Sequence, residues 1–197
     1  MSKVGVFGGT FDPPHYGHLR AAEVARDVLA LDSVLFVPAA NPPHKQGIAV
    51  TDAEMRMEML EEVLAGEDGF ELCRIEIERG GSSYTIDTLD ALQRAHPDTE
   101  YWFITGSDAF VEIQTWRSWD LLLARYAFAV HERPGTRMDE AKRVVPPSLG
   151  ERIVFLRRQM LDVSSSGIRR SVRDGESIRF LVPEPVADYI RRKRLYQ

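Results

Sequence analysis

Cysteine is almost absent from this sequence, because its 197 residues include only Cys73. One thiol can form neither an internal disulfide nor a cysteine-rich zinc site, and such usage is typical of a reducing compartment. Long apolar runs are absent too, since the stretch from Leu121 to Val130 is interrupted by Arg125 and is far shorter than the ~20 residues of a membrane span. The first residues lack the apolar region of a secretion signal. We therefore predict a soluble cytoplasmic protein that has no membrane segment.

The common phosphate-binding and metal-binding patterns are missing as well. The sequence contains no G-x-x-x-x-G-K-[ST], which excludes a P-loop enzyme. The spacing of Gly5, Gly8 and Gly9 does not give G-x-G-x-x-G, the usual dinucleotide fingerprint. Asp, His and Cys residues do not cluster at the spacing of metal ligands, so we expect no dedicated metal site.

Charge is distributed unevenly along the chain, whose net charge is −5. Residues 1–150 have 14 basic and 24 acidic side chains, whereas residues 151–197 have 11 and 6. The acidic part would repel a nucleic-acid backbone, and the basic run 191–194 is typical of the solvated C-terminal end of a helix. This pattern favours a small anionic ligand and predicts no nucleic-acid partner.

Short apolar runs alternate with helical periodicity, which predicts a parallel sheet covered by helices on both faces. Helices are expected to begin near residues 17, 51, 85 and 107, and the last part of the chain is expected to be helical. The predicted strands cover residues 4–7, 33–39, 70–77, 101–105, 127–131 and 153–156. We predict an α/β fold with one doubly wound, Rossmann-like sheet in a single domain over 1–197, with its sheet core over about 1–160 and a C-terminal helical segment over about 161–197 on the same core. Ligands of such sheets bind beyond the carboxyl ends of the strands, here at the loops after strands one, two, four and six.

The segment from Gly8 to His18 joins the first predicted strand to the first predicted helix. Gly8 and Gly9 let the backbone approach a ligand closely, and the helix N-terminus presents unpaired N–H groups to an anion. His15 and His18 are three residues apart at this N-terminus, so both imidazoles can face the same phosphate group. This combination predicts a nucleotide-binding loop.

A second segment, Val163 to Arg169, reads V-S-S-S-G-I-R. Its serines can cap a helix and bind phosphate, and Arg169 adds a positive charge one turn along. This segment and His15-Tyr16-Gly17-His18 resemble the I-S-S-T-x-I-R and H-x-G-H motifs of the nucleotidyltransferase superfamily. Ser166 stands where that pattern commonly has Thr, which keeps the hydroxyl group.

Further segments are similar to one family of that superfamily, the bacterial nicotinate-mononucleotide adenylyltransferases. They lie at residues 41–45, 83–89, 106–108, 115–116, 133–135 and 181–196. The resemblance therefore extends in order over nearly the whole chain. It implies that ATP and nicotinate mononucleotide react to give deamido-NAD and pyrophosphate, a step in NAD biosynthesis.

The resemblance implies a role for each matching residue. His15 and His18 would act on the reacting phosphates. The implied ATP-binding residues are Gly8, Gly9, Thr10, Phe11, Gly106, Asp108, Ser165, Ser166, Ile168 and Arg169. The implied residues for the second substrate are His44, Lys45, Thr85, Trp116 and Arg133, with the pyridine ring stacked on the indole of Trp116.

The implied reaction requires no protein nucleophile. The phosphate of nicotinate mononucleotide can attack the α-phosphorus of ATP directly, in line with the departing pyrophosphate. Because both substrates are anions, we expect Mg²⁺ bound through the ATP phosphates.

Two other functions are weighed against this one. Pantetheine-phosphate adenylyltransferases share the His15/His18 motif, but the segments 83–89 and 41–45 do not resemble them. A non-catalytic nucleotide sensor or an RNA-binding fragment would be expected to lack a motif histidine or to have a basic body. The preference for nicotinate over nicotinamide and the oligomeric state stay open at the level of sequence.

Overall fold

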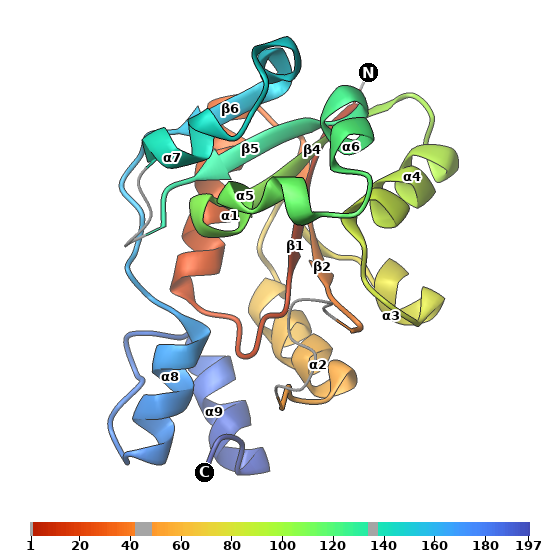
Figure 1. The fold of residues 1–197 in the computed structure, drawn as a ribbon. Helices are drawn as coiled ribbons and strands as arrows, with labels where there is room; N and C mark the ends of the chain where they lie inside the picture. The colour runs from red at the N-terminus through yellow and green to blue at the C-terminus, as the bar shows by residue number, and fades with distance from the viewer. Residues whose placement is uncertain (1, 42–48, 134–137) are drawn as a thin grey trace.

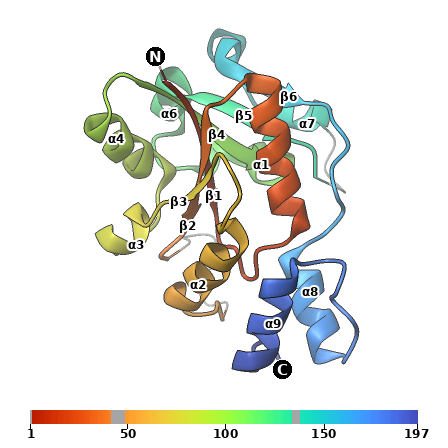
Figure 2. The same ribbon diagram turned by 180° about the vertical axis from the view of Figure 1, so that it is seen from behind.

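The structure, a computed structural model, describes residues 2–41, 49–133 and 138–197. Six strands form one sheet in the order β3-β2-β1-β4-β5-β6, and every neighbouring pair is parallel. The strands are β1 (Ser2–Gly9), β2 (Ser33–Pro38), β3 (Phe70–Leu72), β4 (Thr99–Gly106), β5 (Ala127–His131) and β6 (Ile153–Leu156). The predicted doubly wound α/β fold is confirmed, and Figures 1 and 2 show helices on both faces of the sheet.

Helices follow the strands along the chain in the described ranges. They are α1 (Tyr16–Leu29), α2 (Ala53–Leu64), α3 (Ile75–Arg79), α4 (Thr85–Ala95), α5 (Ser107–Val111), α6 (Trp119–Arg125), α7 (Met138–Arg143), α8 (Ser165–Arg173) and α9 (Glu184–Lys193). Two short 3-10 turns, Ile113–Thr115 and Pro147–Arg152, precede α6 and β6. None of the helices in the described part of the chain is long and apolar enough to span a membrane.

Successive strand residues enter two separate hydrophobic cores, because side chains of a strand point alternately to its two faces. Phe103 of β4 packs with α4, α5, α6 and α7, whereas the next residue, Ile104, packs with α1, α2, α8 and α9. Phe128 and Ala129 of β5 divide in the same way. The continuous apolar runs of the sequence thus reflect strands that are buried on both faces.

The third predicted strand, 70–77, is wrong in its second half. β3 ends at Leu72, and residues 75–79 form α3 instead. The last backbone hydrogen bond from this segment to β2 is donated by the Cys73 N–H to the carbonyl of Phe36, at 2.9 Å. Two residues further along that edge of β2 lies Pro38, which has no N–H to continue the ladder.

The strand order reverses direction between β1 and β4, which are neighbours in the sheet. The loops at the carboxyl ends of these strands therefore open on opposite faces and leave a crevice between them. Figures 1 and 2 show α8 and α9 at this end of the sheet, beside the loop that joins β1 to α1. Val186, Tyr189 and Ile190 of α9 share one core cluster with Met59 and Leu60 of α2.

Candidate active site

Two cavities lie at the carboxyl ends of the central strands. The first has a volume of about 470 Å³, and the second a volume of about 510 Å³. They share the wall formed by Gly8, Gly9 and Thr10. The site residues predicted from sequence that line the first cavity are Gly8, Gly9, Thr10, Phe11, His15, His18, Gly106, Asp108, Arg133, Ser165, Ser166 and Arg169. The structure thus brings the histidines and the serine-rich segment, which lie at opposite ends of the chain, to one cavity.

The two histidines are stacked at the start of α1. Their ring centroids are 3.6 Å apart with 22° between the ring planes. The backbone N–H of His15 donates to Nδ1 of His18 at 3.2 Å, so the His18 ring is oriented by the N-cap residue of its own helix. The His15 side chain is only 1% exposed, and in the described structure its Nδ1 is buried without a hydrogen-bond partner.

His15 is a neutral imidazole at neutral pH. Burial, and then the positive charge of Arg133, lower the pKa of His15 to about 3. A neutral imidazole still has one N–H that it can donate, so His15 can form a hydrogen bond to a phosphate oxygen without being charged.

Gly17 lets the two motifs approach each other. A Cβ at this position would lie 3.0 Å from two atoms of the His15 ring and 3.3 Å from the carbonyl oxygen of Val163. A larger residue between the histidines would therefore force the His15 ring or the segment that leads into α8 to shift by a few tenths of an ångström.

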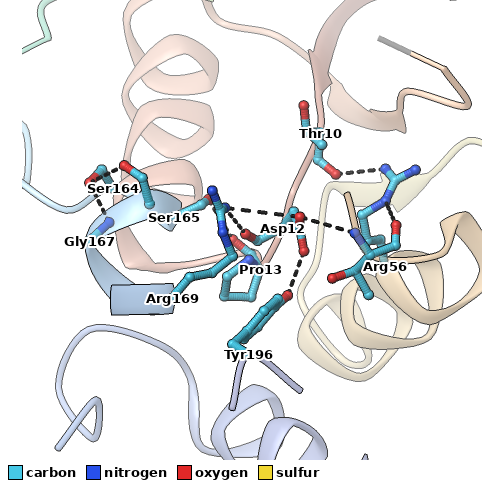
Figure 3. A network of polar contacts seen from close by, with 11 residues as sticks. Thr10, Asp12, Pro13, Arg56, Ser164, Ser165, Gly167, Arg169 and Tyr196 are labelled. Atoms are coloured by element: carbon cyan, nitrogen blue, oxygen red, sulfur yellow. Dashed lines mark hydrogen bonds and ion pairs between the residues drawn. The ribbon is translucent and has the colours of Figure 1, made fainter. Parts of the chain in front are cut away.

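Hydrogen bonds join α8 to the loop after β1 (Figure 3). Ser164 is the N-cap of α8, and its Oγ accepts from the Gly167 N–H at 3.1 Å. Ser165 Oγ donates to the carbonyl of Pro13 at 2.9 Å, and Arg169 Nη1 donates to the carbonyl of Asp12 at 2.6 Å. The N-terminus of α8 thus faces the cavity beside the glycine loop, where its N–H groups favour an anion.

The first turn of α5 and the loop after β5 supply a paired carboxylate and guanidinium. Arg133 Nε lies 3.5 Å from Asp108 Oδ2, and the Arg133 N–H donates to Ser107 Oγ at 2.9 Å. A Cβ on Gly106 would lie 2.7 Å from Cγ of Arg133 and closer still to the Asp108 carboxylate. The absence of a side chain at Gly106 gives the Asp108 and Arg133 side chains the space in which they meet at the end of β4.

The second cavity holds Thr85 and Trp116, as expected for one pocket. It also contains Arg117, whose guanidinium lies 4.8 Å from the centroid of the Tyr84 ring and 3.2 Å from Asp87. Among the described residues that line this cavity, Arg117 supplies the positive charge.

Comparison with known proteins identifies the family to which this chain belongs. Residues 6–171 match a family described as cytidylyltransferase-like. A protein of Moorella thermoacetica, named "Probable nicotinate-nucleotide adenylyltransferase", is 44% identical over 99% of this chain and 92% of its own length. The chain belongs to the nicotinate-nucleotide adenylyltransferase family.

Other members agree over the whole length of the chain. A relative from Clostridium tetani, which has the same name, is 38% identical to this chain. The match covers 100% of both proteins. The nicotinic acid mononucleotide adenylyltransferase of Plasmodium falciparum, solved in complex with NaAD, has the same fold with a TM-score of 0.85. That match covers 100% of this chain and 98% of the other, at 21% identity.

One described residue that was predicted for the adenylyltransferase site, Ile168, lines neither cavity. The Ile168 side chain is buried in the core that includes α1 and α9. Ile168 lies on the buried face of α8. The assignment of Ile168 to ATP binding stays a prediction. His44 and Lys45 lie outside the described residues.

Several cavity residues of this family member were not predicted from sequence. Asp12, His131 and Ser164 line the first cavity, and Arg117 lines the second. Asp12 lies in the segment from Gly8 to His18 and Ser164 in the segment from Val163 to Arg169, which was the available signal. His131 follows a buried strand, and burial lowers its pKa to about 4. His131 ends β5, a strand whose loop the general rule for such sheets did not select, although the resemblance assigned Arg133 in that loop to the second substrate.

Proposed function

We propose that this protein transfers the AMP part of ATP to nicotinate mononucleotide, giving deamido-NAD and pyrophosphate in NAD biosynthesis. The name shared by relatives that match the full chain supports this activity. The observation that carries it is the pair of cavities with a common wall, one lined by the histidines and serines and the other by Thr85 and Trp116. Two substrates held on either side of Gly8–Thr10 would have their phosphates close together. The lone Cys73 favours the cytoplasm as the place of reaction.

ATP is assigned to the first cavity. His15 and His18 would donate hydrogen bonds to its phosphate oxygens, while the N-terminus of α8 and Arg169 would stabilise the departing pyrophosphate. Gly106 and Asp108 would contact the ribose or phosphate-linked groups, because both line this cavity, Gly106 as the last residue of β4 and Asp108 in the first turn of α5.

Nicotinate mononucleotide is assigned to the second cavity. Its pyridine ring would stack on Trp116 next to Thr85, and Arg117 would attract its carboxylate. Arg133, with His44 and Lys45, is assigned to the substrate phosphates.

The reaction proceeds by direct in-line displacement in this proposal. A phosphate oxygen of nicotinate mononucleotide forms a bond to the α-phosphorus of ATP, and the bond between that phosphorus and the bridging oxygen breaks. Pyrophosphate leaves with the electron pair, and no covalent enzyme intermediate forms. The protein orients two anions and stabilises charge that develops on the α-phosphate and the leaving group.

Mg²⁺ is expected to enter with the ATP phosphates. Among the described residues, no group of three or more His, Cys, Asp or Glu side chains could hold a metal ion. Two carboxylates in the described part of the chain line the first cavity, and the Asp12 side chain is buried whereas that of Asp108 is half exposed, so Asp108 is the one that would hold the ion, through water. When bound, the ion would neutralise phosphate charge.

Pyrophosphate release tests the proposal directly. The protein is incubated with ATP, Mg²⁺ and either nicotinate mononucleotide, nicotinamide mononucleotide or phosphopantetheine. We expect the highest kcat/KM with nicotinate mononucleotide, and deamido-NAD as the product in chromatography. Release only with phosphopantetheine would contradict the proposal, and release with none of the three would indicate a nucleotide-binding protein without this activity.

A further inference from the structure

A hydrogen bond joins the segment after α9 to the loop after β1. The phenol of Tyr196 donates to Oδ1 of Asp12 at 2.6 Å (Figure 3). Asp12 lies in the loop Thr10–Pro13, which lines the cavity assigned to ATP. The two residues are 184 positions apart, so this contact connects the end of the fold to its first loop.

The Asp12 carboxylate requires such partners because it is buried beside an anion site. Its residue is only 2% exposed, and its Oδ2 accepts the Thr51 N–H at 3.2 Å. A carboxylate at this wall would repel a triphosphate unless its charge is held and directed away from the phosphates. Tyr196 and Thr51 do this by occupying one carboxylate oxygen each.

Arg169 lines the same cavity as Asp12, so the Asp12 carboxylate and the ATP phosphates would compete for its guanidinium. Its Nη1 donates to the Asp12 carbonyl at 2.6 Å but lies 4.0 Å from the Asp12 carboxylate. A carboxylate released by Tyr196 could turn to Arg169 and form a direct ion pair. That pairing would withdraw the guanidinium from the ATP phosphates.

Other contacts fix the backbone of the same loop but do not touch the carboxylate. Arg56 is buried and donates to the carbonyls of Thr10, Ala39 and Thr51 at 2.7, 2.8 and 2.9 Å. Among the described side chains, Tyr196 is the one that donates a hydrogen bond to the carboxylate itself.

The backbone at Tyr196 is in an unfavourable conformation that the surrounding fold maintains. Its φ is +66°, in the left-handed region that non-glycine residues rarely adopt. The preceding Leu195 N–H donates to the Ile190 carbonyl at 3.0 Å, and the Leu195 and Tyr196 side chains pack against the core of α1, α2 and α9. Burial and the Asp12 contact raise the pKa of the Tyr196 phenol, which keeps it a neutral donor at physiological pH.

We propose that Tyr196 is a positioning residue for adenylyl transfer, which holds the Asp12 carboxylate so that Arg169 stays available to the ATP phosphates. This inference rests on the proposed function, because it assigns the first cavity to ATP. Tyr196 contributes to ATP binding and to kcat through Asp12, without touching the reacting atoms.

The test compares two tyrosines that make the same bond. Tyr196→Phe removes the phenol that contacts Asp12. The control, Tyr189→Phe, removes a phenol that donates from α9 to Glu58 on α2 at 2.5 Å, away from the loop. We expect Tyr196→Phe to lower kcat/KM for ATP about tenfold, as for loss of a bond to a charged group, with an unchanged KM for nicotinate mononucleotide. Tyr189→Phe is expected to change neither constant.

A double-mutant cycle with Asp12→Asn tests the route of the effect. If Tyr196 acts through the Asp12 charge, the double variant Asp12→Asn/Tyr196→Phe loses no more than Asp12→Asn alone. Additive losses, or equal rises in the KM of both substrates together with a lower Tm, would identify a general structural role and overturn the proposal.

Calorimetric binding of α,β-methylene-ATP separates this proposal from the proposed function. We expect binding to the unaltered protein and about tenfold weaker binding to Tyr196→Phe. Absent binding to the unaltered protein would refute the proposed function itself, whereas equal binding to both proteins would overturn only the role of Tyr196.

Discussion

His18 is the more accessible of two stacked imidazoles, and the backbone N–H of His15 contributes to its orientation. The N–H of His15 donates to Nδ1 of His18, so Nδ1 is an acceptor and a neutral His18 ring has its proton on Nε2. His15 is almost fully buried beneath it and is neutral, so the pair offers hydrogen bonds rather than two positive charges. At this scale the residue types were predictable from H-x-G-H, but their stacking and their burial were not, because both depend on packing against α8.

Replacement of His18 tests its role in the transition state. We expect His18→Ala to lower kcat by about 10²-fold or more, the magnitude found when a charge-stabilising donor is removed. His96, an exposed histidine at the C-cap of α4, gives the matched control His96→Ala, for which we expect unchanged kinetics. The measurement is steady-state pyrophosphate release, and an unchanged kcat in His18→Ala would reject the role.

Arg117 is expected to favour an acidic pyridine ring over an amide. Arg117→Gln removes the positive charge from the second cavity, so the ratio of kcat/KM for nicotinate over nicotinamide mononucleotide should fall about fivefold, a modest effect because the side chain is half exposed. Arg125→Gln is the control, since Arg125 also pairs with an aspartate, Asp90, and also lies near a tyrosine ring, that of Tyr126. An unchanged ratio in Arg117→Gln would show that this charge does not contribute to selection.

Elements were predictable where the local pattern and the tertiary contacts agree. Strands β1, β2, β4, β5 and β6 lie where apolar runs predicted them, because each run is buried on both faces. The error at 70–77 has a long-range cause, since the edge of β2 ends at Pro38, which is 32 residues before β3 begins. No pattern within 70–77 carries that information.

The approach of α1 to the segment before α8 depends on Gly17. Gly17→Ala would place a methyl group against the His15 ring and the Val163 carbonyl, which requires one of them to move. Alanine also gains up to about 1 kcal/mol of helix propensity, and this gain offsets much of the crowding, which costs about 1–3 kcal/mol. We therefore expect about tenfold lower kcat/KM for ATP with a change in Tm of only a few degrees, measured by kinetics and thermal circular dichroism. Full activity in Gly17→Ala would show that the close contact is dispensable.

At the scale of the whole molecule, the motifs predicted convergence, and the sheet order explains how it is achieved. The loop after β1 and the segment before α8 meet because β1 is central in the sheet and α8 follows the last strand back across its end. The contributions of Arg56 and Tyr196 could not be predicted, because each acts on a carbonyl or carboxylate that is distant in sequence. Residues that contact the ligand are therefore easier to identify from a sequence pattern than residues that hydrogen-bond other parts of the protein.

Two buried neutral histidines should make the free energy of unfolding depend on pH. Burial lowers the pKa of His15 to about 3 and that of His131 to about 4, whereas both approach 6.5 in the unfolded chain. Below pH 6.5 the unfolded state therefore binds protons that the folded state does not, so stability falls as the pH decreases toward these values. For His131 alone the loss between pH 7 and pH 5 is about 2 kcal/mol.

Urea unfolding at pH 7 and pH 5 measures this difference independently of the baseline stability of a variant. His131→Gln removes one titrating group, so the difference between the two pH values should shrink by about 2 kcal/mol, even if the variant is less stable at both. His96→Gln, at an exposed position, should leave the difference unchanged. If the free energy of unfolding changes equally between the two pH values in His131→Gln and in the unaltered protein, His131 is protonated in the folded state at pH 5. The first cavity would then be more hydrated than the packing of His131 against Phe7 indicates.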